Sequence, residues 1–381
     1  MELLDLRATR AIIHLDAFAR NCAAVRRRTG AERRLCVPVK AGAYGHGALR
    51  IARAAGEAGA FCLAVATVWE GAELRRGGIT LPVLLFSEPL PREIPALLEN
   101  RLTPFVSGMD TARALAAAAA GCGIRLPVHL KIDTGMGRAG CAPEDAIQLA
   151  RCIAGSSSLE YAGTATHFAA ADSADPADAV YTRRQIAIFE DALRDIRSAG
   201  IDTGIVHAAN SGAVILHPAS WFDMVRPGIL LYGYKTVEEP AGTEAAPLSV
   251  EPVMELKTQV TLVKKIRRGE SLSYGRTWIA ERDTTVALLP VGYADGLPRR
   301  VGNAWRVRIN GERYPLAGRI CMDQCLVDVG DAPVRRYDEV TVFGGEAPGA
   351  DALAELAGTI PYEITCGVSA RVPRIYAGNG D

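Results

Sequence analysis

A lysine at the end of a short apolar run is the first residue whose position suggests chemistry. The stretch VPVKAGAYGHG, residues 37–47, places Lys40 after an apolar segment and before three glycines, Tyr44 and His46. A lysine at a strand end more often reaches out to solvent than takes part in catalysis. If other cations lie close and water is partly excluded, the pKa of its amine falls and it can form a Schiff base. The neighbours of Lys40 therefore decide between the two interpretations.

Further polar residues stand at the ends of later apolar runs, or just before one. Together with Arg138 they form a mainly basic group, which favours an anionic ligand. Ser211, Gly228 and Ile229 can offer a hydroxyl group and backbone N–H groups to a phosphate. These neighbours favour the reactive interpretation of Lys40 without identifying a cofactor. The polar residues at these positions are Lys131, Asp133, His167, His207, Asn210, Ser211 and Arg226.

Three other kinds of site have weaker support. The stretch GMGRAG, residues 135–140, matches a dinucleotide-binding pattern, but Arg138 crowds that loop and Glu160 precedes an apolar run instead of ending one. Ser211 and His207 lie in HAANSG, which is not a nucleophile elbow, so a hydrolase triad is not supported. We predict no catalytic metal, because the sequence has no HExxH and no paired CxxC.

The elements that must position these residues repeat along the first part of the chain. Eight short runs between Cys36 and Gly233 are apolar nearly throughout, which is typical of parallel strands buried on both faces. Segments of helical period separate them, so we predict an α/β fold with a (β/α)8 TIM-type barrel. In such a barrel the ends of the strands carry the active site. The runs are CVPVK, CLAVA, PVLLFS, TPFVS, LPVHLKID, AGTATHF, GIVHAA and GILLYG.

The second part of the chain has a different pattern. Residues 235–252 are rich in Glu, Pro, Ala and Gly, which is typical of a linker. Alternating runs rich in β-branched residues follow, with RVRINGERY as a hairpin signal and one late helix near Ala350. We therefore expect a barrel at residues 11–240 and a mostly-β C-terminal domain at residues 241–381, which residues 1–10 could join.

Composition and charge limit the classes of partner. Lys plus Arg and Asp plus Glu both number 43, so the chain has no overall basic charge to attract nucleic acid or an anionic membrane. It has no apolar run of membrane-spanning length, no signal-peptide pattern, and nine scattered cysteines that suit a reducing compartment. We expect a cytoplasmic protein whose partners are small molecules or a second copy of itself.

Ten segments, in order along both predicted domains, resemble the alanine racemases, which are pyridoxal 5′-phosphate (PLP) enzymes of fold type III. The resemblance covers nearly the whole chain. It implies PLP-dependent interconversion of L-alanine and D-alanine, with D-alanine supplied for peptidoglycan synthesis. The segments are VKAGAYGHG, HLKIDTGMGRAG, THFAAAD, VHAANSGAV, MVRPGILLYG, LSYGRTW, LPVGYADGLPR, GRICMDQCLVDVG, DEVTVFG and PYEITCGVSARVPRIY.

The same resemblance implies roles for residues around the cofactor. Lys40 carries PLP, and Arg226 faces its pyridine nitrogen with His167 as a buttress. Because an arginine stays charged, it cannot accept the ring proton, which limits side reactions that need a better electron sink. Further PLP contacts are implied for Tyr44, Asn210, Ser211, Gly228, Ile229 and Tyr362.

Racemisation needs two acid/base groups on opposite faces of the reacting carbon. The resemblance assigns Lys40 to one face and Tyr274, lent by the partner in a head-to-tail homodimer, to the other. Without the resemblance, Tyr274 would be taken for a packed strand aromatic. The resemblance also implies that Arg138 and Met322 bind substrate. Two further residues, Tyr293 and Asp323, are implied at the substrate entrance.

Three details bear on chemistry and specificity. Lys131 matches a position that is carbamylated in many members of the family, and such a carbamate would hold Arg138. Gly42 replaces the asparagine that the family block usually has, which adds backbone freedom. The resemblance also implies that Tyr362 favours alanine over the larger or hydroxylated substrates of related racemases.

Other PLP functions remain open alternatives. A fold type III decarboxylase keeps an acid where this chain has Arg226. A PLP carrier made of a barrel alone would not need Tyr274. A broad-specificity serine or basic-amino-acid racemase is the closest competitor, and relative turnover of alanine, serine and lysine separates it from an alanine racemase.

Overall fold

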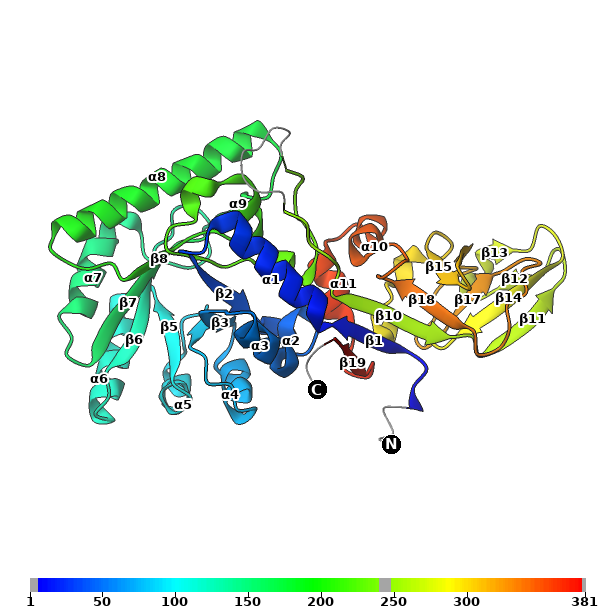
Figure 1. The fold of residues 1–381 in the computed structure, drawn as a ribbon, viewed down its shortest axis with the longest axis horizontal. Coiled ribbons are helices and arrows are strands. Elements are labelled where there is room, and N and C mark those ends of the chain that lie inside the picture. The colour runs from blue at the N-terminus through cyan, green and yellow to red at the C-terminus, as the bar shows by residue number, and fades with distance from the viewer. Residues whose placement is uncertain (1–5, 240–247, 379–381) are drawn as a thin grey trace.

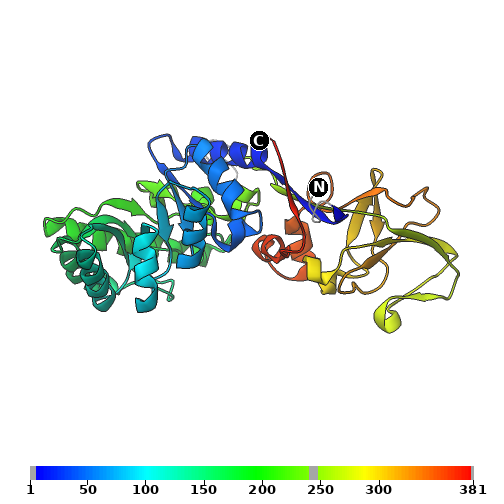
Figure 2. The ribbon, with the colours of Figure 1, turned by 90° about the horizontal axis from the view of Figure 1, so that it is seen from below.

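The computed structural model describes residues 6–239 and 248–378. Two parts lie along the long axis of the molecule, a barrel with its helices at one end and a mostly-β part at the other (Figure 1, Figure 2). Helix α1 and strands β1 and β10 lie where the two parts meet.

The barrel of eight parallel strands that the sequence predicts is confirmed. Its strands are buried on both faces, as in β5, where all five residues are buried, which explains why the runs are apolar throughout. The strands are β2 (Arg34–Pro38), β3 (Cys62–Val65), β4 (Val83–Leu85), β5 (Leu102–Val106), β6 (Leu126–Lys131), β7 (Leu159–Ala165), β8 (Ile205–His207) and β9 (Met224–Val225).

Helices cover the outside of the barrel and follow its strands (Figure 1). The α-helices of this part are α1 (Leu15–Thr29), α2 (Lys40–Tyr44), α3 (Ala48–Glu57), α4 (Val68–Arg76), α5 (Ile94–Glu99), α6 (Met109–Gly121), α7 (Ala146–Ala154), α8 (Pro176–Ser198) and α9 (Ser211–Leu216). The short 3-10 helices are η2 (Pro91–Glu93), η3 (Pro143–Asp145), η4 (Pro218–Ser220) and η5 (Ile229–Tyr232).

The prediction for the eighth strand is wrong in position. The run GILLYG was expected to form it, but the strand is β9, and Ile229–Tyr232 form η5. Pro227 has no N–H to donate to a ladder. The N–H groups of Gly228 and Leu230 donate instead to Ser211 Oγ, at 2.9 and 3.3 Å. An apolar run of this length does not by itself separate a strand from a short helix.

The second part is mostly β, as predicted. A six-stranded sheet has the order β16-β15-β18-β10-β1-β19, a three-stranded sheet the order β11-β14-β17, and β12 pairs with β13. The predicted hairpin is confirmed by the antiparallel pairing of β15 with β16. The strands are β1 (Arg10–His14), β10 (Met254–Gln259), β11 (Leu262–Ile266), β12 (Ser271–Leu272), β13 (Trp278–Ile279), β14 (Thr284–Leu289), β15 (Arg306–Ile309), β16 (Glu312–Pro315), β17 (Cys325–Asp328), β18 (Glu339–Phe343) and β19 (Arg374–Ala377). The helices are α10 (Ala350–Ala357), α11 (Pro361–Gly367), η6 (Tyr274–Arg276), η7 (Tyr293–Asp295) and η8 (Arg299–Val301).

Strand β1 belongs to the six-stranded sheet, although it precedes the barrel in the chain. It pairs antiparallel with β10 and parallel with β19. The first strand of the 11–240 segment therefore lies outside the barrel wall. The predicted junction at 240/241 lies outside the described residues, so the division into domains stays a prediction.

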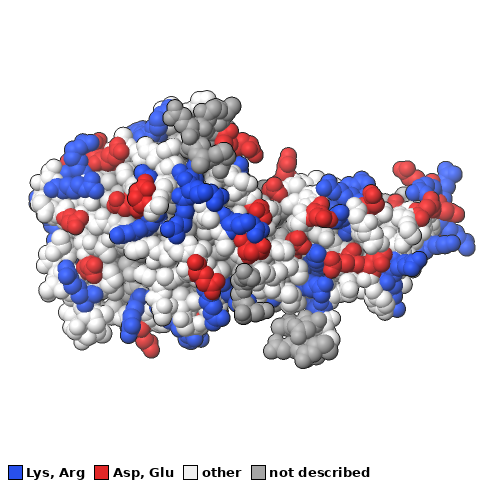
Figure 3. Space-filling model, in the orientation of Figure 1, with Lys and Arg blue, Asp and Glu red and all other residues white. Residues whose placement is uncertain are grey.

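The surface in view carries both signs of charge, with Lys and Arg interspersed among Asp and Glu over both parts (Figure 3). Within residues 6–239 and 248–378, no helix is long and apolar enough to cross a membrane.

Candidate active site

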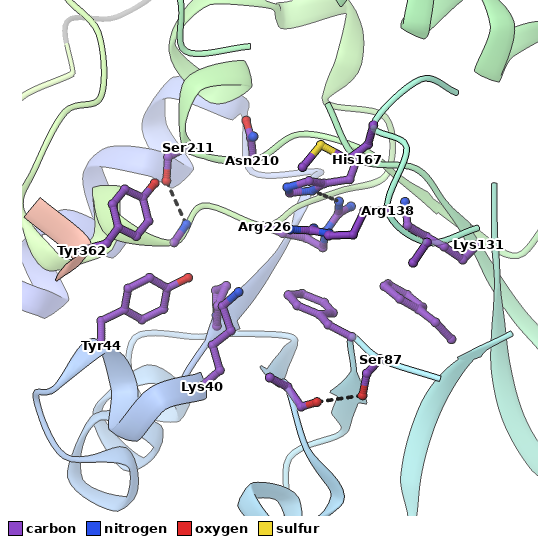
Figure 4. A pocket seen from close by; sticks show the side chains of 17 residues that line it. Lys40, Tyr44, Ser87, Lys131, Arg138, His167, Asn210, Ser211, Arg226 and Tyr362 are labelled. Atoms are coloured by element: carbon purple, nitrogen blue, oxygen red, sulfur yellow. Dashed lines mark hydrogen bonds between the residues drawn. The ribbon is translucent and has the colours of Figure 1, made fainter. Parts of the chain in front are cut away.

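A cavity of about 280 Å³ opens at the carboxyl ends of the barrel strands. In Figure 4 the hydroxyl groups of Tyr44, Tyr362 and Ser211 lie on one side and Arg138 and Lys131 on the other. The amine of Lys40 and the guanidinium of Arg226 lie between them. The lining residues are Pro38, Lys40, Tyr44, Ala66, Phe86, Ser87, Phe105, Lys131, Met136, Arg138, Ala139, His167, Asn210, Ser211, Arg226, Gly228 and Tyr362.

Lys40 is followed by a turn of left-handed helix. The φ angles of Ala41, Gly42 and Ala43 are 51°, 62° and 55°, and Tyr44 and Gly45 also have positive φ. Hydrogen bonds run from Ala43 N to Val39 O at 2.8 Å and from Gly45 N to Ala41 O at 3.0 Å. Left-handed geometry costs about 1–2 kcal/mol for each residue other than glycine, so the surrounding structure must hold this turn.

His46 supports the turn from inside. It is completely buried, and its Nδ1–H donates to Ala43 O at 3.0 Å and to Tyr44 O at 2.9 Å. Burial lowers the pKa of His46 to about 4, so the ring is neutral at physiological pH. Tyr44 in turn stacks on Tyr232 with ring centroids 4.8 Å apart.

The amine of Lys40 has the properties of a nucleophile. Burial and then the charge of Arg138 lower its pKa, and the charge of Glu70 opposes this shift. A lysine in such surroundings is deprotonated more easily than one in water, which favours Schiff-base formation. The expectation that Lys40 merely extends to solvent does not fit a side chain that lines a cavity.

Arg226 is buried and held by neutral groups. Its Nη1 donates to His207 Nδ1 at 2.7 Å, and its Nη2 donates to Thr166 O at 2.8 Å and Ala208 O at 3.0 Å. The contact from Nη2 to His167 Nδ1 is longer, at 3.5 Å, so His207 is the closer histidine partner. Burial lowers the pKa of Arg226 to about 10, which leaves the guanidinium charged at neutral pH.

The far end of the cavity is rich in groups that bind anions. Ser211 Oγ accepts from the N–H of Gly228, and Tyr362 lies beside Ser211 (Figure 4). A Cβ on Gly228 would fall 2.5 Å from Tyr44 Oη, so only glycine leaves this space open. Ile229 follows in η5 but does not line the cavity, and Asn210 Oδ1 caps α9 by accepting from Ala213 N–H.

The opposite end of the cavity is lined by basic side chains. Lys131 is buried in β6, and burial together with the charge of Arg226 lowers its pKa well below the usual value. Arg138 also lines the cavity. Among the lining residues that the structure describes, none is a carboxylate. The site therefore accepts an anionic ligand, and it offers no acid to a heterocyclic nitrogen beside Arg226.

Four predicted site residues lie away from this cavity in the single chain. Tyr274 is 68% exposed in η6, which lies in the chain between β12 and β13, and these two strands are at the end of the molecule opposite the barrel (Figure 1). Tyr293 and Met322 are also exposed, and the N–H of Ala294 donates to Met322 O. Asp323 pairs with Arg371 at 2.8 Å. None of the four lines the cavity of its own chain.

Sequence reasoning missed several residues at the cavity. Phe86 and Phe105 stack with centroids 5.5 Å apart, and the Arg226 guanidinium lies 5.9 Å from the Phe86 ring. Both belong to strand-end runs that were searched for polar side chains only. Glu70, which does not line the cavity, was also missed, because the Thr67-x-x-Glu70 spacing indicates only a helix cap.

Comparisons with known proteins identify the family to which the chain belongs. The N-terminal domain model of alanine racemase matches residues 13–236, and the C-terminal domain model matches residues 253–376. The chain is 48% identical to an alanine racemase of Treponema denticola over 378 residues, covering 97% of this chain and 98% of the relative. The chain belongs to the alanine racemase family. The enzymes of this family are PLP-dependent isomerases.

Solved structures of alanine racemases have the same fold. The Clostridium difficile 630 enzyme is 34% identical with a TM-score of 0.91, covering 98% of this chain and 96% of that one. The Bacillus anthracis enzyme with bound L-Ala-P is 33% identical with a TM-score of 0.88, covering 98% and 96%. The barrel with a mostly-β C-terminal part is therefore the alanine racemase architecture.

Proposed function

We propose that this enzyme interconverts L-alanine and D-alanine with PLP, Lys40 being the residue that carries the cofactor. The observation that carries the proposal is the cavity, where a lysine of lowered pKa and a buried arginine meet without a carboxylate among the described lining residues. A decarboxylase of this fold type would need an acid in the place of Arg226. As in the family resemblance, the D-alanine would serve peptidoglycan synthesis.

The residues present suit PLP. The phosphate fits among the hydroxyl groups of Tyr44, Ser211 and Tyr362, and the space left by Gly228 admits it. Ile229 and Asn210 support that end through η5 and the start of α9. Bound PLP withdraws electrons from the substrate, so that its Cα proton becomes acidic. Arg226 is fixed by four hydrogen-bond acceptors, including His167, and would offer a positive charge to the bound cofactor.

Two proton carriers are needed because inversion removes the proton from one face of Cα and returns it on the other. We assign the Lys40 amine to one face and the Tyr274 hydroxyl to the other. We infer a homodimer in which the partner subunit supplies this tyrosine, because Tyr274 does not line the cavity of its own chain. Met322 would reach the substrate from the same subunit as Tyr274, with Tyr293 and Asp323 at the entrance.

Arg138 would bind the substrate carboxylate, and the charge on the Lys131 side chain would determine how firmly Arg138 is held in position. Lys131 is buried, and the positive charge of the exposed Arg138 disfavours the charged form of its amine. A carbamate on Lys131 would replace that repulsion with a charge-assisted hydrogen bond. Intact-mass measurement of the peptide that contains Lys131, prepared without acid, tests this part of the proposal.

Circular dichroism of L-alanine solutions tests the reaction directly. The purified, PLP-loaded protein should bring the optical signal to zero, and borohydride should fix the cofactor mass on Lys40. A protein that binds PLP but leaves the signal of alanine unchanged while racemising serine or lysine would refute the substrate assignment.

Mixing two inactive variants tests the shared site. Lys40→Ala and Tyr274→Phe should each lose at least about a thousandfold in kcat. If the subunits share residues, a hybrid dimer has one site in which both Lys40 and Tyr274 are intact, and activity should return on mixing. Recovery of no activity after subunit exchange, verified by native mass spectrometry, would contradict the assignment of Tyr274 to the partner's site.

A further inference from the structure

The carboxylate of Glu70 forms the start of helix α4. The backbone N–H of Glu70 donates to Thr67 Oγ1 at 3.2 Å, and Glu70 Oε2 accepts from the N–H of Thr67 at 3.1 Å, which together make a capping box. Oε2 also accepts from the N–H of Ala66 at 2.8 Å. These contacts alone would explain a glutamate here as a helix cap.

The other carboxylate oxygen makes a contact that capping does not require. Glu70 Oε1 accepts from the N–H of Ala41 at 2.7 Å. Ala41 directly follows Lys40 and is the first residue of the left-handed turn. Both hydrogen bonds of the capping box are made without Oε1, so this third contact has a separate effect.

That contact joins the ends of two neighbouring barrel strands. β2 and β3 pair in parallel, with Pro38 opposite Ala64, and the two loops that Glu70 bridges leave these strands. The N–H of Ala41 lies in the same rigid peptide plane as the Cα of Lys40. A hydrogen bond to a carboxylate is about twice as strong as one between neutral groups. Fixing this plane therefore fixes the backbone from which the Lys40 side chain extends.

We propose that Glu70 is a positioning residue, which holds the Ala41 peptide so that the Lys40 amine enters the cavity in one direction. This inference rests on the proposed function, because it concerns the amine that moves the substrate proton. The charge of Arg138 lowers the pKa of Lys40, and the carboxylate of Glu70 acts in the opposite direction. Glu70 itself does not line the cavity.

Three variants separate positioning from capping. Glu70→Gln has one acceptor oxygen in place of two, and that oxygen should stay on the two amides of Ala66 and Thr67, so that the NH2 group faces the Ala41 N–H and this contact is lost. Glu70→Asp keeps the charge at the start of α4, and its shorter side chain cannot reach both loops. Thr67→Ala is the matched control, because it removes a hydrogen bond from the same capping box and leaves Glu70 in place.

The variants are compared as PLP-loaded proteins. Both Glu70 variants should lower kcat for alanine by at least about tenfold with little change in KM, since a displaced proton carrier costs rate more than binding. Amide hydrogen exchange in residues 40–47, followed by mass spectrometry, should become faster. Thr67→Ala should keep kcat within about twofold and keep the exchange rate of that segment, although α4 loses a cap.

Two results would overturn the proposal. In one, the Glu70 variants match Thr67→Ala in kcat. In the other, faster exchange is confined to α4 and spares residues 40–47. Failure of the wild-type protein to racemise alanine would refute the proposed function instead, and the exchange comparison would still test the link between Glu70 and the turn.

Discussion

At the scale of single residues, Gly42 shows why this chain can depart from its family. Its φ is 62°, and a Cβ built there meets nothing within 4 Å. Residue 42 must therefore adopt a left-handed backbone conformation, and there is room for a side chain at this position. Glycine and asparagine are the residues that enter this conformation most readily. The usual asparagine and the glycine here therefore meet the same backbone demand.

The effect of a substitution at Gly42 on stability should depend on how easily the new residue adopts positive φ. Gly42→Asn should keep the free energy of unfolding within about 0.5 kcal/mol, and Gly42→Val should lose about 1–2 kcal/mol, because a β-branched side chain disfavours positive φ. Urea denaturation measures both. Equal stability of the two variants would show that the turn is not left-handed in solution.

Many residues of the candidate site could be predicted from the sequence one residue at a time. Lys40, Lys131, Arg226 and Ser211 could be found by searching strand ends for polar side chains, and the structure brings all four to one cavity. The closer contact of Arg226 with His207 than with His167 depends on side-chain geometry, which a sequence does not display. Glu70 acts through a backbone N–H, so no residue pattern near Lys40 points to it.

At the scale of elements, the left-handed turn is packed against helix α11. A Cβ on Gly45 would fall 2.0 Å from Thr365 O, which is backbone and cannot move away alone. Gly45→Ala should therefore displace α11, which carries Tyr362, and should lower both stability, by about 2 kcal/mol or more, and PLP affinity. Gly42→Ala is the control, since it adds the same methyl group to the same turn in open space. Urea denaturation and PLP titration measure the effects, and equal losses in the two variants would contradict the packing argument.

The order and type of most helices and strands could be predicted from the spacing of apolar residues and from turn signals. The first and last residues of each element could not. The eighth barrel strand is short, and its apolar successor GILLYG carried the stronger pattern. The membership of β1 in the distant sheet is a long-range pairing, with Ile12 opposite Glu255 and Ile375. Local sequence holds no record of such a pairing.

At the scale of the whole molecule, histidine burial predicts the dependence of stability on pH. Burial lowers the pKa of five of the six histidines, to about 4 for His46 and about 3 for His129, whereas a hydrogen bond to Glu255 raises that of His14. Below pH ~6.5 the unfolded chain therefore binds more protons than the folded one. The stabilisation is complete above that pH and is lost as the pH falls toward about 4.

Each fully buried histidine should contribute up to roughly 3 kcal/mol over this interval. Denaturant unfolding of the wild-type protein at a series of pH values from 7 to ~4.5 should show a falling free energy of unfolding. His46→Asn, which cannot titrate, should be less stable at pH 7 but should have a shallower dependence on pH. An unchanged slope would mean that His46 is protonated in the folded protein.

Strand β1 lies between β10 and β19, so the first and last of the described strands are neighbours in one sheet. The barrel is thus an insertion between two strands that pair with each other. During synthesis on the ribosome, the barrel can close before β10 is available to pair with β1. The six-stranded sheet is complete only after β19 has been synthesised. Until then β1 presents unpaired edges, which can pair wrongly with strands of other chains.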